Sequence, residues 1–465
     1  MILDRVYTPG LAQVAYLIAD EVAGEVAVID PRRDIDAYLE WAAKRGLKIT
    51  AILETHVHAD FVSGARELAA ATGAPIYASR LGQSEFPHRP LDDGDEIAVG
   101  RLRLRAFWTP GHTPEHMSFL LYDPAQRDAP IALYSGDLLF VGEVGRPDLL
   151  GPAHTQGLAE QLYETFANRL TWLPDDVIVY PGHTAGSSCG RKIGDAPHTT
   201  MGQERRFNYA MQPATLASKE TFISAVLSDL PTPPTYYPTM KRVNKVGPAL
   251  LSELPAGRPL DPDEVEHRLA AGALVMDARS PQAFLAAHIP GSYFAGDSPD
   301  FVNWAGWLAP YDRDLILIVD DEAHFEAART DLRRIGLDSV AGYLEGGVEA
   351  WQASGRPVAS IPEITPSQLH DRLQSAQDLV VLDVRSSAEW KSGRISGAAN
   401  RFVGEIARGA EIPVNGASTL AVICGTGYRS TVAISLLEPL GRWDLVNVAG
   451  GMVAWAEAGL PVETE

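Results

Sequence analysis

Four short stretches of the sequence place histidine or aspartate directly after apolar runs that are typical of β-strands. The first is residues 55–61, Thr-His-Val-His-Ala-Asp-Phe, which follows the apolar run 49–53. The others are residues 109–113 (TPGHT), 135–137 (SGD) and 181–184 (PGHT). Imidazole and carboxylate groups delivered by separate strand ends can converge on one ion. The four stretches together therefore predict a metal site at the edge of a sheet.

A different chemistry is indicated by residues 424–429, Cys-Gly-Thr-Gly-Tyr-Arg. They follow the buried-strand pattern 420–423 and precede a predicted helix over 430–437. Glycines in such a loop let backbone N–H groups point inward, and these groups and the helix dipole stabilise negative charge on a cysteine sulfur. Arg429 adds a fixed positive fork at the end of the loop. The pattern predicts that Cys424 is held as a reactive thiolate.

The region around Cys424 is one of two copies of a longer pattern. Three segments recur about a hundred residues later: 275–280 (VMDARS) as 381–386 (VLDVRS), 288–292 (HIPGS) as 394–398 (RISGA), and 346–351 (GGVEAW) as 450–455 (GGMVAW). This period exceeds that of solenoid repeats, so it indicates two copies of a whole small domain.

The first copy lacks the cysteine loop. After the strand-like run 315–319 it has Asp-Asp-Glu-Ala-His-Phe at residues 320–325, where the second copy has its cysteine and glycines. An aspartate cannot carry a persulfide sulfur, and an acidic loop repels thiolate and sulfite. We expect this copy to be inactive and structural, a spacer that aims the last domain.

The elements that must position these residues alternate between strand and helix patterns. Predicted strands are 13–18, 25–29, 49–53, 75–78, 102–108, 117–122, 131–134 and 177–180, and predicted helices are 35–45, 65–72 and 202–209. By themselves these patterns predict only an α/β domain. Residues 231–238, Pro-Thr-Pro-Pro-Thr-Tyr-Tyr-Pro, are too proline-rich for a helix or a central strand. We interpret residues 231–259 as a semi-rigid connector.

Length and composition set further limits. A chain of 465 residues with 46% hydrophobic residues should hold about three globular domains. The net charge of -21, without a Lys/Arg cluster, argues against nucleic-acid binding. No apolar run has transmembrane length and the N-terminus does not resemble a signal peptide, so we expect a cytoplasmic protein without membrane contact. Only two cysteines, Cys189 and Cys424, occur, and a disulfide between them is not expected.

The histidine and aspartate motifs of residues 1–230 resemble those of the metallo-β-lactamase fold, which implies an αββα sandwich. Dinuclear hydrolases of this fold carry a histidine after the motif aspartate, but this chain has Phe61 there. The resemblance implies that His56, His112 and Asp137 are the ligands of a single Fe²⁺ per chain, as in the persulfide dioxygenase branch. Residues 142–149, GEVGRPDL, are very similar to a stretch typical of that branch.

The same resemblance places other residues near the metal. His58, Asp60 and His183 are expected beside it, orienting the ligands or bound water. Arg146 is a candidate for the substrate pocket. The loop with Cys189, followed by Arg191 and Lys192, could receive an anionic low-molecular-weight thiol, although a plain loop cysteine fits the pattern as well.

Both repeat copies resemble rhodanese domains, five-stranded parallel α/β units with an Asp-x-Arg motif after the second strand. The resemblance covers residues 260–359 and 363–465. The loop at residues 424–429 has the length typical of the sulfurtransferase type. The chain is therefore expected to be an α/β multidomain protein, with a metallo-β-lactamase sandwich followed by two rhodanese-like domains.

The combined resemblance implies Fe²⁺-dependent oxidation of a thiol persulfide by O₂, giving sulfite and free thiol in sulfide detoxification. The thiol would be of the glutathione or coenzyme A type. Cys424 and Arg429 would then link persulfide, sulfite and thiosulfate by sulfur transfer, in a protein that we expect to be a dimer or tetramer. One alternative is a glyoxalase-II-like thioester hydrolase with an appended sulfurtransferase. Another is a sulfur carrier or sensor whose metal domain only supports partner binding.

Overall fold

The computed structural model describes residues 1–375, 378–414 and 418–464, which form two compact units. The first unit comprises Met1–Leu254 with Arg333–Gly336, and the second comprises Pro255–Leu332 with Leu337–Glu465. Glu465, the predicted end of the last domain, lies outside the described residues.

The first unit contains two six-stranded sheets. Their strand orders are β1-β2-β3-β4-β5-β6 and β12-β11-β10-β9-β8-β7. The strands of the first sheet are β1 (Ile2–Thr8), β2 (Gln13–Asp20), β3 (Glu25–Ile29), β4 (Lys48–Leu53), β5 (Ile76–Ser79) and β6 (Arg89–Leu91). Those of the second are β7 (Glu96–Val99), β8 (Leu102–Trp108), β9 (Met117–Tyr122), β10 (Ala132–Gly136), β11 (Ile178–Pro181) and β12 (Thr199–Thr200).

Helices cover the outer faces of both sheets. They are α1 (Asp36–Lys44), α2 (Ala65–Thr72), α3 (Pro152–Glu164), α4 (Met201–Phe207), α5 (Pro213–Leu216), α6 (Lys219–Leu227) and α7 (Tyr237–Val246). Single 3₁₀ or π turns are η1 (Arg80–Gly82), η2 (Thr165–Arg169), η3 (Tyr209–Met211) and η4 (Leu251–Glu253). In the described part of the chain, no helix combines the length and the apolar character that a membrane crossing needs.

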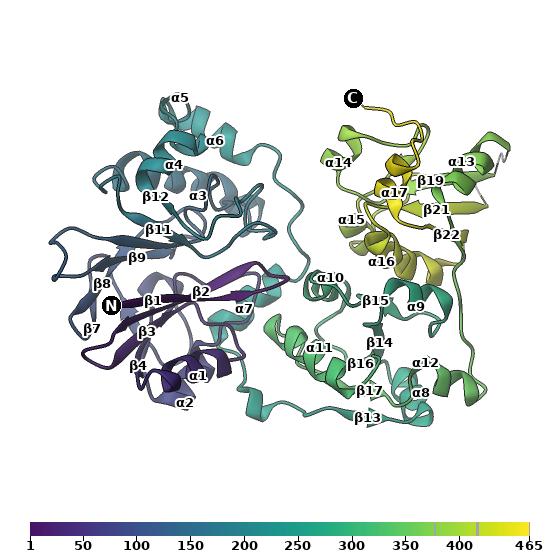
Figure 1. The fold of residues 1–465 in the computed structure, drawn as a ribbon, viewed down its shortest axis with the longest axis horizontal. Helices are drawn as coiled ribbons and strands as arrows, with labels where there is room; N and C mark the ends of the chain where they lie inside the picture. The colour runs from purple at the N-terminus through teal and green to yellow at the C-terminus, as the bar shows by residue number, and fades with distance from the viewer. Residues whose placement is uncertain (376–377, 415–417, 465) are drawn as a thin grey trace. The chain divides into compact units, whose positions relative to one another are not determined.

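Burial explains why the strands of this unit stack in layers. Every residue of β2 and of β9 is buried, which requires cover on both faces of each sheet. One core cluster, which includes Leu53, Phe119 and Tyr134, lies between the sheets, and two others lie under the helices. In Figure 1, α1 and α2 lie on one side of the paired sheets and α3 to α6 on the other. The predicted αββα sandwich is confirmed.

Helix α7 lies within the segment that the sequence suggested is a connector. Its proline, Pro238, occupies the first turn, where the missing N–H has no helical acceptor, so the helix tolerates it. Asn244 on α7 donates to the carbonyls of His58 (2.9 Å) and Phe61 (2.7 Å). The first unit therefore includes residues beyond 230, because α7 is bonded to the loop that carries the metal motif.

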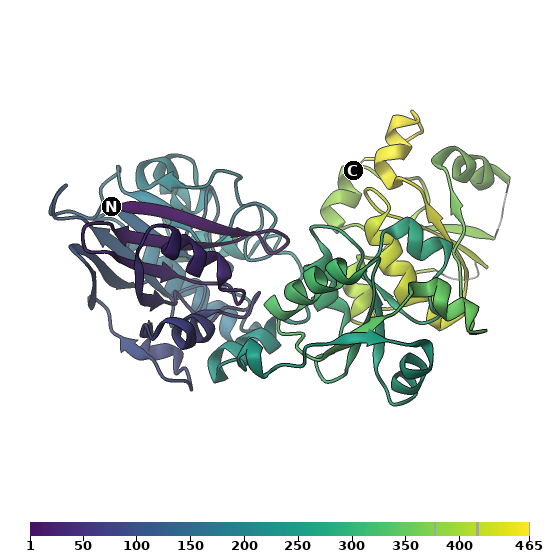
Figure 2. The same ribbon diagram turned by 60° about the horizontal axis from the view of Figure 1, so that its bottom comes forward.

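The second unit contains two five-stranded sheets in which every strand pair is parallel, with orders β13-β17-β16-β14-β15 and β18-β22-β21-β19-β20. The strands are β13 (Arg258–Leu260), β14 (Leu274–Asp277), β15 (Tyr293–Phe294), β16 (Leu315–Ile318) and β17 (Val340–Leu344), then β18 (Glu363–Ile364), β19 (Leu379–Asp383), β20 (Ala399–Asn400), β21 (Thr419–Ile423) and β22 (Asp444–Val448). Each sheet is flanked by helices (Figure 2). The predicted pair of rhodanese-like domains is confirmed.

The helices of the second unit connect the strands in the same order in both copies. They are α8 (Pro262–Ala270), α9 (Pro281–Ala286), α10 (Phe301–Leu308), α11 (Glu322–Arg334) and α12 (Gly347–Ala353), then α13 (Pro366–Ser375), α14 (Ser387–Ser392), α15 (Val403–Ala407), α16 (Tyr428–Leu437) and α17 (Gly451–Glu457), with the 3₁₀ turn η5 (Glu438–Leu440) after α16. The repeated Asp-x-Arg motif forms a buried ion pair in each copy, Asp277–Arg279 and Asp383–Arg385, at 2.6 Å in both.

Candidate functional site

The structure brings together the three predicted metal ligands of the first unit. His56 follows β4, His112 follows β8 and Asp137 follows β10, so separate strands of the two sheets supply them. Asp137 Oδ2 lies 3.9 Å from His56 Nε2 and 3.6 Å from His112 Nε2. All three side chains are buried, and their candidate ligand atoms lie within 4.8 Å of one another.

The three converging atoms lack other partners. Within the described residues, His56 Nε2, His112 Nε2 and Asp137 Oδ2 are buried and have no hydrogen-bond partner. Leaving three such polar atoms unsatisfied costs several kcal/mol, roughly 1–3 kcal/mol each. A bound cation compensates that cost, and two imidazoles with one carboxylate suit a non-haem Fe²⁺. The residues therefore fit the predicted metal.

Hydrogen bonds orient both imidazoles toward the centre of the site. His112 Nδ1–H donates to the carbonyl of Arg146 at 3.0 Å. Thr55 Oγ1 donates to Asp30 Oδ2 (2.8 Å), so it can only accept from His56 Nδ1 (2.9 Å). With the proton on Nδ1 in both rings, Nε2 presents a lone pair toward the centre.

The charge states of the three residues suit metal binding. Burial lowers the pKa of His56, and the charge of His58 adds to this effect. Burial also lowers the pKa of His112. Burial opposes the charge of Asp137, but His183, His112 and His58 together lower the pKa of that carboxyl. The site therefore offers two neutral imidazoles and one carboxylate, the forms that bind a metal.

His183 and Asp60 lie beside this triad but are committed to each other. His183 Nδ1–H donates to Asp137 Oδ1 and Nε2–H donates to Asp60 Oδ2, both at 2.7 Å. Burial opposes the charge of His183, yet the two carboxylates raise its pKa well above the usual value. An imidazolium with both protons engaged has no lone pair for a metal. In this arrangement His183 orients Asp137 instead.

His58 belongs to a second buried cluster, with Asp30 and Glu54. Its Nε2 lies 3.1 Å from Asp30 and 3.7 Å from Glu54. Burial opposes the charge of His58, but Asp30, Glu54 and Asp60 together raise its pKa to about 9. The ring of Phe61 contacts the His58 ring with centroids 4.4 Å apart. Phe61 therefore fills the space beside His58 with an apolar ring.

Several supporting residues were not identified from the sequence. Asp30 and Thr55 orient His56, as described above. His116 Nε2 accepts from the backbone N–H of Asp137 (3.1 Å), and its Nδ1 is bonded to Thr109 Oγ1 (2.9 Å). The histidine four residues after His112 was a visible signal for His116. No local pattern signals Asp30, because its role depends on the pairing of β3 with β4.

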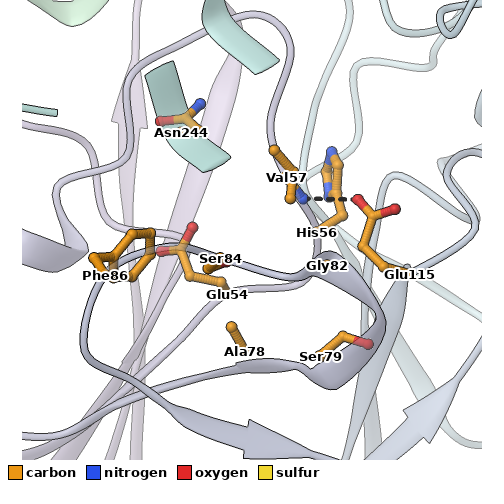
Figure 3. A pocket seen from close by; sticks show the side chains of 10 residues that line it. All are labelled: Glu54, His56, Val57, Ala78, Ser79, Gly82, Ser84, Phe86, Glu115 and Asn244. Carbon is orange, nitrogen blue, oxygen red and sulfur yellow. Dashed lines mark hydrogen bonds between the residues drawn. The ribbon is translucent and has the colours of Figure 1, made fainter. Parts of the chain in front are cut away.

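A pocket opens beside His56. Figure 3 shows Glu115 on one side of it, where its carboxylate accepts from the Val57 N–H (3.0 Å), and Asn244 of α7 on another side. Tyr237, Lys241 and Asn244 are spaced by four and three residues on α7 and so lie on one helix face. The Tyr237 hydroxyl lies 4.0 Å from Cys189 Sγ. The half-buried Lys241 is therefore presented to the same side as the metal motif and Cys189.

Lys241 also interacts electrostatically with the site. Burial lowers the pKa of its ammonium, while Glu115, Cys189 and Asp137 oppose that effect. Its charge also contributes to the lowered pKa values of His56 and His112. The heptad-like spacing of Tyr237, Lys241 and Asn244 was the available sequence signal, but the prolines before it suggested a connector.

Cys189 lies next to Asp60 and His183. Candidate ligand atoms of the three residues lie within 4.8 Å of one another, and all three side chains are buried. Burial raises the pKa of the Cys189 thiol well above its usual value, and the charges of Asp137 and Asp60 raise it further. Cys189 is therefore a neutral thiol in this environment. Its predicted contact with a thiol substrate stays a prediction.

The predicted substrate-binding cations make structural contacts. Arg146 is buried, with bonds to both oxygens of Asp148 (2.7 Å each) and to the carbonyls of Ser188 (3.2 Å) and Pro231 (2.6 Å). Arg191 donates to the carbonyls of residues 225 and 228 (3.0 and 2.9 Å). Lys192 is exposed. These bonds use donors of both arginines for loop packing, so a substrate contact for these cations stays a prediction.

In the second unit, Cys424 lies at the end of β21 and before α16. The backbone N–H of Gly427 donates to Cys424 Sγ at 3.1 Å, and Ser430 Oγ lies 3.6 Å from the sulfur. Gly427 has a φ of 105°, a conformation that favours glycine, and it is the N-cap of α16. One backbone N–H of the predicted cradle, that of Gly427, therefore donates to the sulfur.

Arg429 is held beside this loop by an ion pair. Its two terminal nitrogens donate to Glu389 at 2.8 and 2.7 Å. Burial opposes the charge of Glu389, but Arg429 and the hydrogen bonds from Ser386 together lower its pKa to about 2. A network from Ser430 to Asn447 (2.7 Å) and on to Glu363 (2.9 Å) supports the other side of the loop.

Comparisons with known proteins agree with this architecture. Residues 8–183 match the Metallo-beta-lactamase superfamily, and residues 261–354 and 365–458 match the Rhodanese-like domain. A solved structure of a metallo-beta-lactamase from Staphylococcus aureus subsp. aureus COL is 36% identical, with a TM-score of 0.66, covering 74% of this chain and 98% of that chain. The chain belongs to the metallo-beta-lactamase superfamily and carries two rhodanese-like domains.

Two relatives are similar to part of the first unit. A hydroxyacylglutathione hydrolase of Polaromonas sp. is 38% identical over 187 residues, 39% of this chain and 66% of the relative. The mitochondrial persulfide dioxygenase ETHE1 of Bos taurus is 30% identical over 187 residues, 39% of this chain and 68% of the relative. The chain thus spans about two thirds of the length of each relative. Both a hydrolase and a dioxygenase occur among its relatives.

Proposed function

We propose that the first unit oxidises a low-molecular-weight thiol persulfide with Fe²⁺ and O₂, and that Cys424 transfers sulfane sulfur. The observation that carries this proposal is the set of unpaired atoms on His56, His112 and Asp137. Two positions that could hold a second metal offer no free ligand atom, since both ring nitrogens of His183 are bonded to carboxylates and Phe61 has no ligand atom. One metal with open positions favours dioxygen chemistry over two-metal hydrolysis.

The overall reaction is R–S–SH + O₂ + H₂O → R–SH + SO₃²⁻ + 2H⁺. The outer sulfur is oxidised to sulfite, dioxygen is reduced, and the sulfur–sulfur bond breaks to release the thiol. When bound, Fe²⁺ supplies the redox chemistry that activates dioxygen. His183 keeps Asp137 anionic and oriented, while Thr55 and the Arg146 carbonyl hold the two imidazoles in place.

Lys241 has the charge that this reaction needs in a substrate pocket. The persulfide and the sulfite product are anions, and the neighbouring Glu115, Asp60 and Asp137 are acidic. An ammonium on the α7 face next to Cys189 attracts the anionic sulfur into an otherwise negative site. Within the proposal, Lys241 binds the substrate, and α7 belongs to the active site.

Cys424 carries out the second step. Its thiolate attacks the sulfane sulfur of thiosulfate, the sulfur–sulfur bond breaks, and sulfite leaves with the electron pair. The Cys424 persulfide then passes its outer sulfur to an acceptor thiolate. The Gly427 N–H stabilises negative charge on sulfur in both steps. The same exchange in reverse consumes sulfite, so it links the oxidation product to thiosulfate.

The test combines metal analysis with oxygen uptake. We expect about one iron per chain after aerobic purification, and oxygen uptake on glutathione persulfide with sulfite as product. His112→Ala removes a proposed metal ligand. It should therefore lower the iron affinity and the oxygen uptake by more than the roughly 100-fold that is lost when a residue bonded to a ligand is replaced. His154→Ala, an exposed histidine on α3, is the matched control and should change neither. Stoichiometric zinc without oxygen uptake would contradict the proposal.

The second candidate is a thioester hydrolase with an appended sulfurtransferase. The 38% identity to a hydroxyacylglutathione hydrolase favours it. This reaction requires a metal-activated water and, in dinuclear enzymes, a second cation. Both ring nitrogens of His183 are bonded to carboxylates, so His183 has no nitrogen left to bind that cation. Steady hydrolysis of S-lactoylglutathione, lost in His112→Ala, would support this candidate. We expect no such hydrolysis.

A further inference from the structure

Helix α16, whose N-terminus forms the cradle for Cys424, is fixed by the inactive rhodanese-like copy at its first residue. The hydroxyl of Tyr428 donates to the carbonyl of Gly296 at 3.1 Å. The Tyr428 ring lies against Phe294, with centroids 5.6 Å apart. Gly296 and Phe294 belong to the copy that lacks the cysteine. The first turn of the catalytic helix is therefore attached to a neighbouring domain.

The other end of α16 is held by the same neighbour. Glu438 follows the helix directly, and its carboxylate accepts from His288 Nε2 at 3.0 and 3.1 Å. His288 is fully buried and its Nδ1 donates to the carbonyl of Phe284 at 2.8 Å. The His288 ring also stacks on the Phe284 ring, with centroids 4.0 Å apart. His288 is thus an immobile partner for Glu438.

The anchor at Gly296 is equally rigid. A Cβ at residue 296 would lie 2.2 Å from the carbonyl oxygen of Arg279 and 2.3 Å from the Phe294 ring. Only glycine fits this close approach, so the carbonyl that accepts from Tyr428 has a fixed position. A third contact joins the copies beside α15, where the Trp307 and Phe402 rings lie with centroids 6.2 Å apart.

The position of α16 decides the geometry around sulfur. Gly427, the N-cap, donates its N–H to Cys424 Sγ, and Ser430 of the first turn lies 3.6 Å from it. Cys424 itself is held by β21 in the centre of its own sheet. A shift of the helix relative to the sheet would therefore move the Gly427 N–H donor and the Ser430 hydroxyl, which accepts from the thiol, away from the sulfur. Tyr428 lies in the sequence between these two residues.

We propose that the inactive copy acts as a positioning element for sulfur transfer, by holding α16 at Tyr428 and Glu438. These two are positioning residues, and the sulfur lies on Cys424. The inference rests on the proposed function of Cys424 where it is tested by the rate of sulfur transfer. It does not rest on that function where it is tested by the alkylation rate of the Cys424 thiol. The anchors His288 and Gly296 lie outside the loop 320–325, so loss of the cysteine from the first copy leaves them intact.

The test uses the full chain with Tyr428→Phe, which removes only the hydroxyl. We expect kcat for sulfur transfer from thiosulfate to cyanide to fall about threefold to tenfold, the value of one net hydrogen bond, with little change in KM. Glu438→Gln, at the opposite end, should produce a smaller loss in the same direction. Tyr343→Phe, on β17 at the other side of the first copy's sheet, is the control and should leave kcat unchanged.

A second readout is independent of turnover. In a Cys189→Ser background Cys424 is the sole thiol, because the chain has 2 cysteines. Its alkylation by iodoacetamide at one pH should slow in Tyr428→Phe by the same factor as kcat, in protein that is still folded. If Tyr428→Phe and Glu438→Gln both leave the alkylation rate and kcat unchanged, the positioning role is overturned. Slowed alkylation in a protein that transfers no sulfur would refute the proposed function and retain the positioning role.

Discussion

The two rhodanese-like copies share their framework and differ at one loop. Each keeps the buried Asp-x-Arg ion pair, and each keeps a tryptophan whose indole N–H donates to a proline carbonyl, Trp351 to Pro357 (2.9 Å) and Trp455 to Pro461 (3.0 Å). Each of these bonds lies within one copy, the tryptophan bond near its C-terminal end. The fold of a copy is therefore specified independently of its sulfur chemistry.

The loops differ in where the following helix begins. In the second copy β21 ends at Ile423 and α16 begins at Tyr428, which leaves room for the cradle. In the first copy β16 ends at Ile318 and α11 begins at Glu322. Position 322 corresponds to Thr426, so helix replaces the turn that would point N–H groups at a sulfur. Replacement of glycines by Asp321 and Ala323 permits this earlier start.

The side chains that support the loop also differ between the two copies. Arg429 and Glu389 correspond to Phe325 and Ala283 in the first copy, so both members of the ion pair are absent there. The Phe325 ring instead packs on Tyr343, with centroids 4.8 Å apart. An apolar contact has replaced a charged one. The first copy has lost the whole supporting set as well as the cysteine, and it retains the surface that holds α16.

The largest expected effect is that of Cys424→Ser. Serine has no sulfur to carry, so transfer from thiosulfate to cyanide should disappear. Oxygen uptake on glutathione persulfide should persist, because the triad lies in the other unit. Parallel assays of the two activities check this. Equal loss of both activities would contradict the division of chemistry between the units.

A smaller effect is expected from restoring cysteine to the first copy. In a Cys424→Ser background, Asp320→Cys alone should give no sulfur transfer, because α11 occupies the turn and the ion pair is missing. Replacing residues 320–325 by the six residues of 424–429, together with Ala283→Glu, should restore alkylation of residue 320 by iodoacetamide. Activity from Asp320→Cys alone would show that the loop surroundings are unimportant.

The smallest effect concerns the ion pair itself. Burial disfavours charged Glu389, but Arg429 and the bonds from Ser386 together hold its folded-state pKa at about 2, below the ordinary 4.5. The pair therefore stabilises the fold above about pH 4.5, and this contribution is lost as the pH falls toward 2. The Glu389 side chain is 38% exposed, so screening reduces the contribution to about 1 kcal/mol.

Urea denaturation of Glu389→Gln and the unsubstituted protein checks this expectation. The variant should be less stable by about 1 kcal/mol at pH 7, and the difference should shrink at pH 3 because the carboxylate is being protonated in the unfolded chain. A difference that stays constant over this range would contradict the assignment. Glu411→Gln, an exposed residue of the same copy, serves as control.

The sequence by itself determined the features that depend on local pattern. His56, His112 and Asp137 each follow an apolar run, and this pattern marked the ends of strands. Side chains at such strand ends can converge at the edge of stacked sheets. The repeated segments identified two copies of one domain, and the missing cysteine distinguished the first copy from the second. The helix of residues 65–72 and the strands of residues 102–108 and 117–122 agree with α2, β8 and β9.

Only the tertiary structure decided which polar atoms remain free. Asp60 and His183 are 123 positions apart, and Asn244 and His58 are 186 apart, yet each pair is bonded. No periodicity predicts such bonds, because they depend on how the sheets and α7 pack. Those bonds engage both ring nitrogens of His183, and packing leaves His56 Nε2, His112 Nε2 and Asp137 Oδ2 without a partner in the described residues. Packing also places Lys241 where its charge lowers the pKa values of His56 and His112.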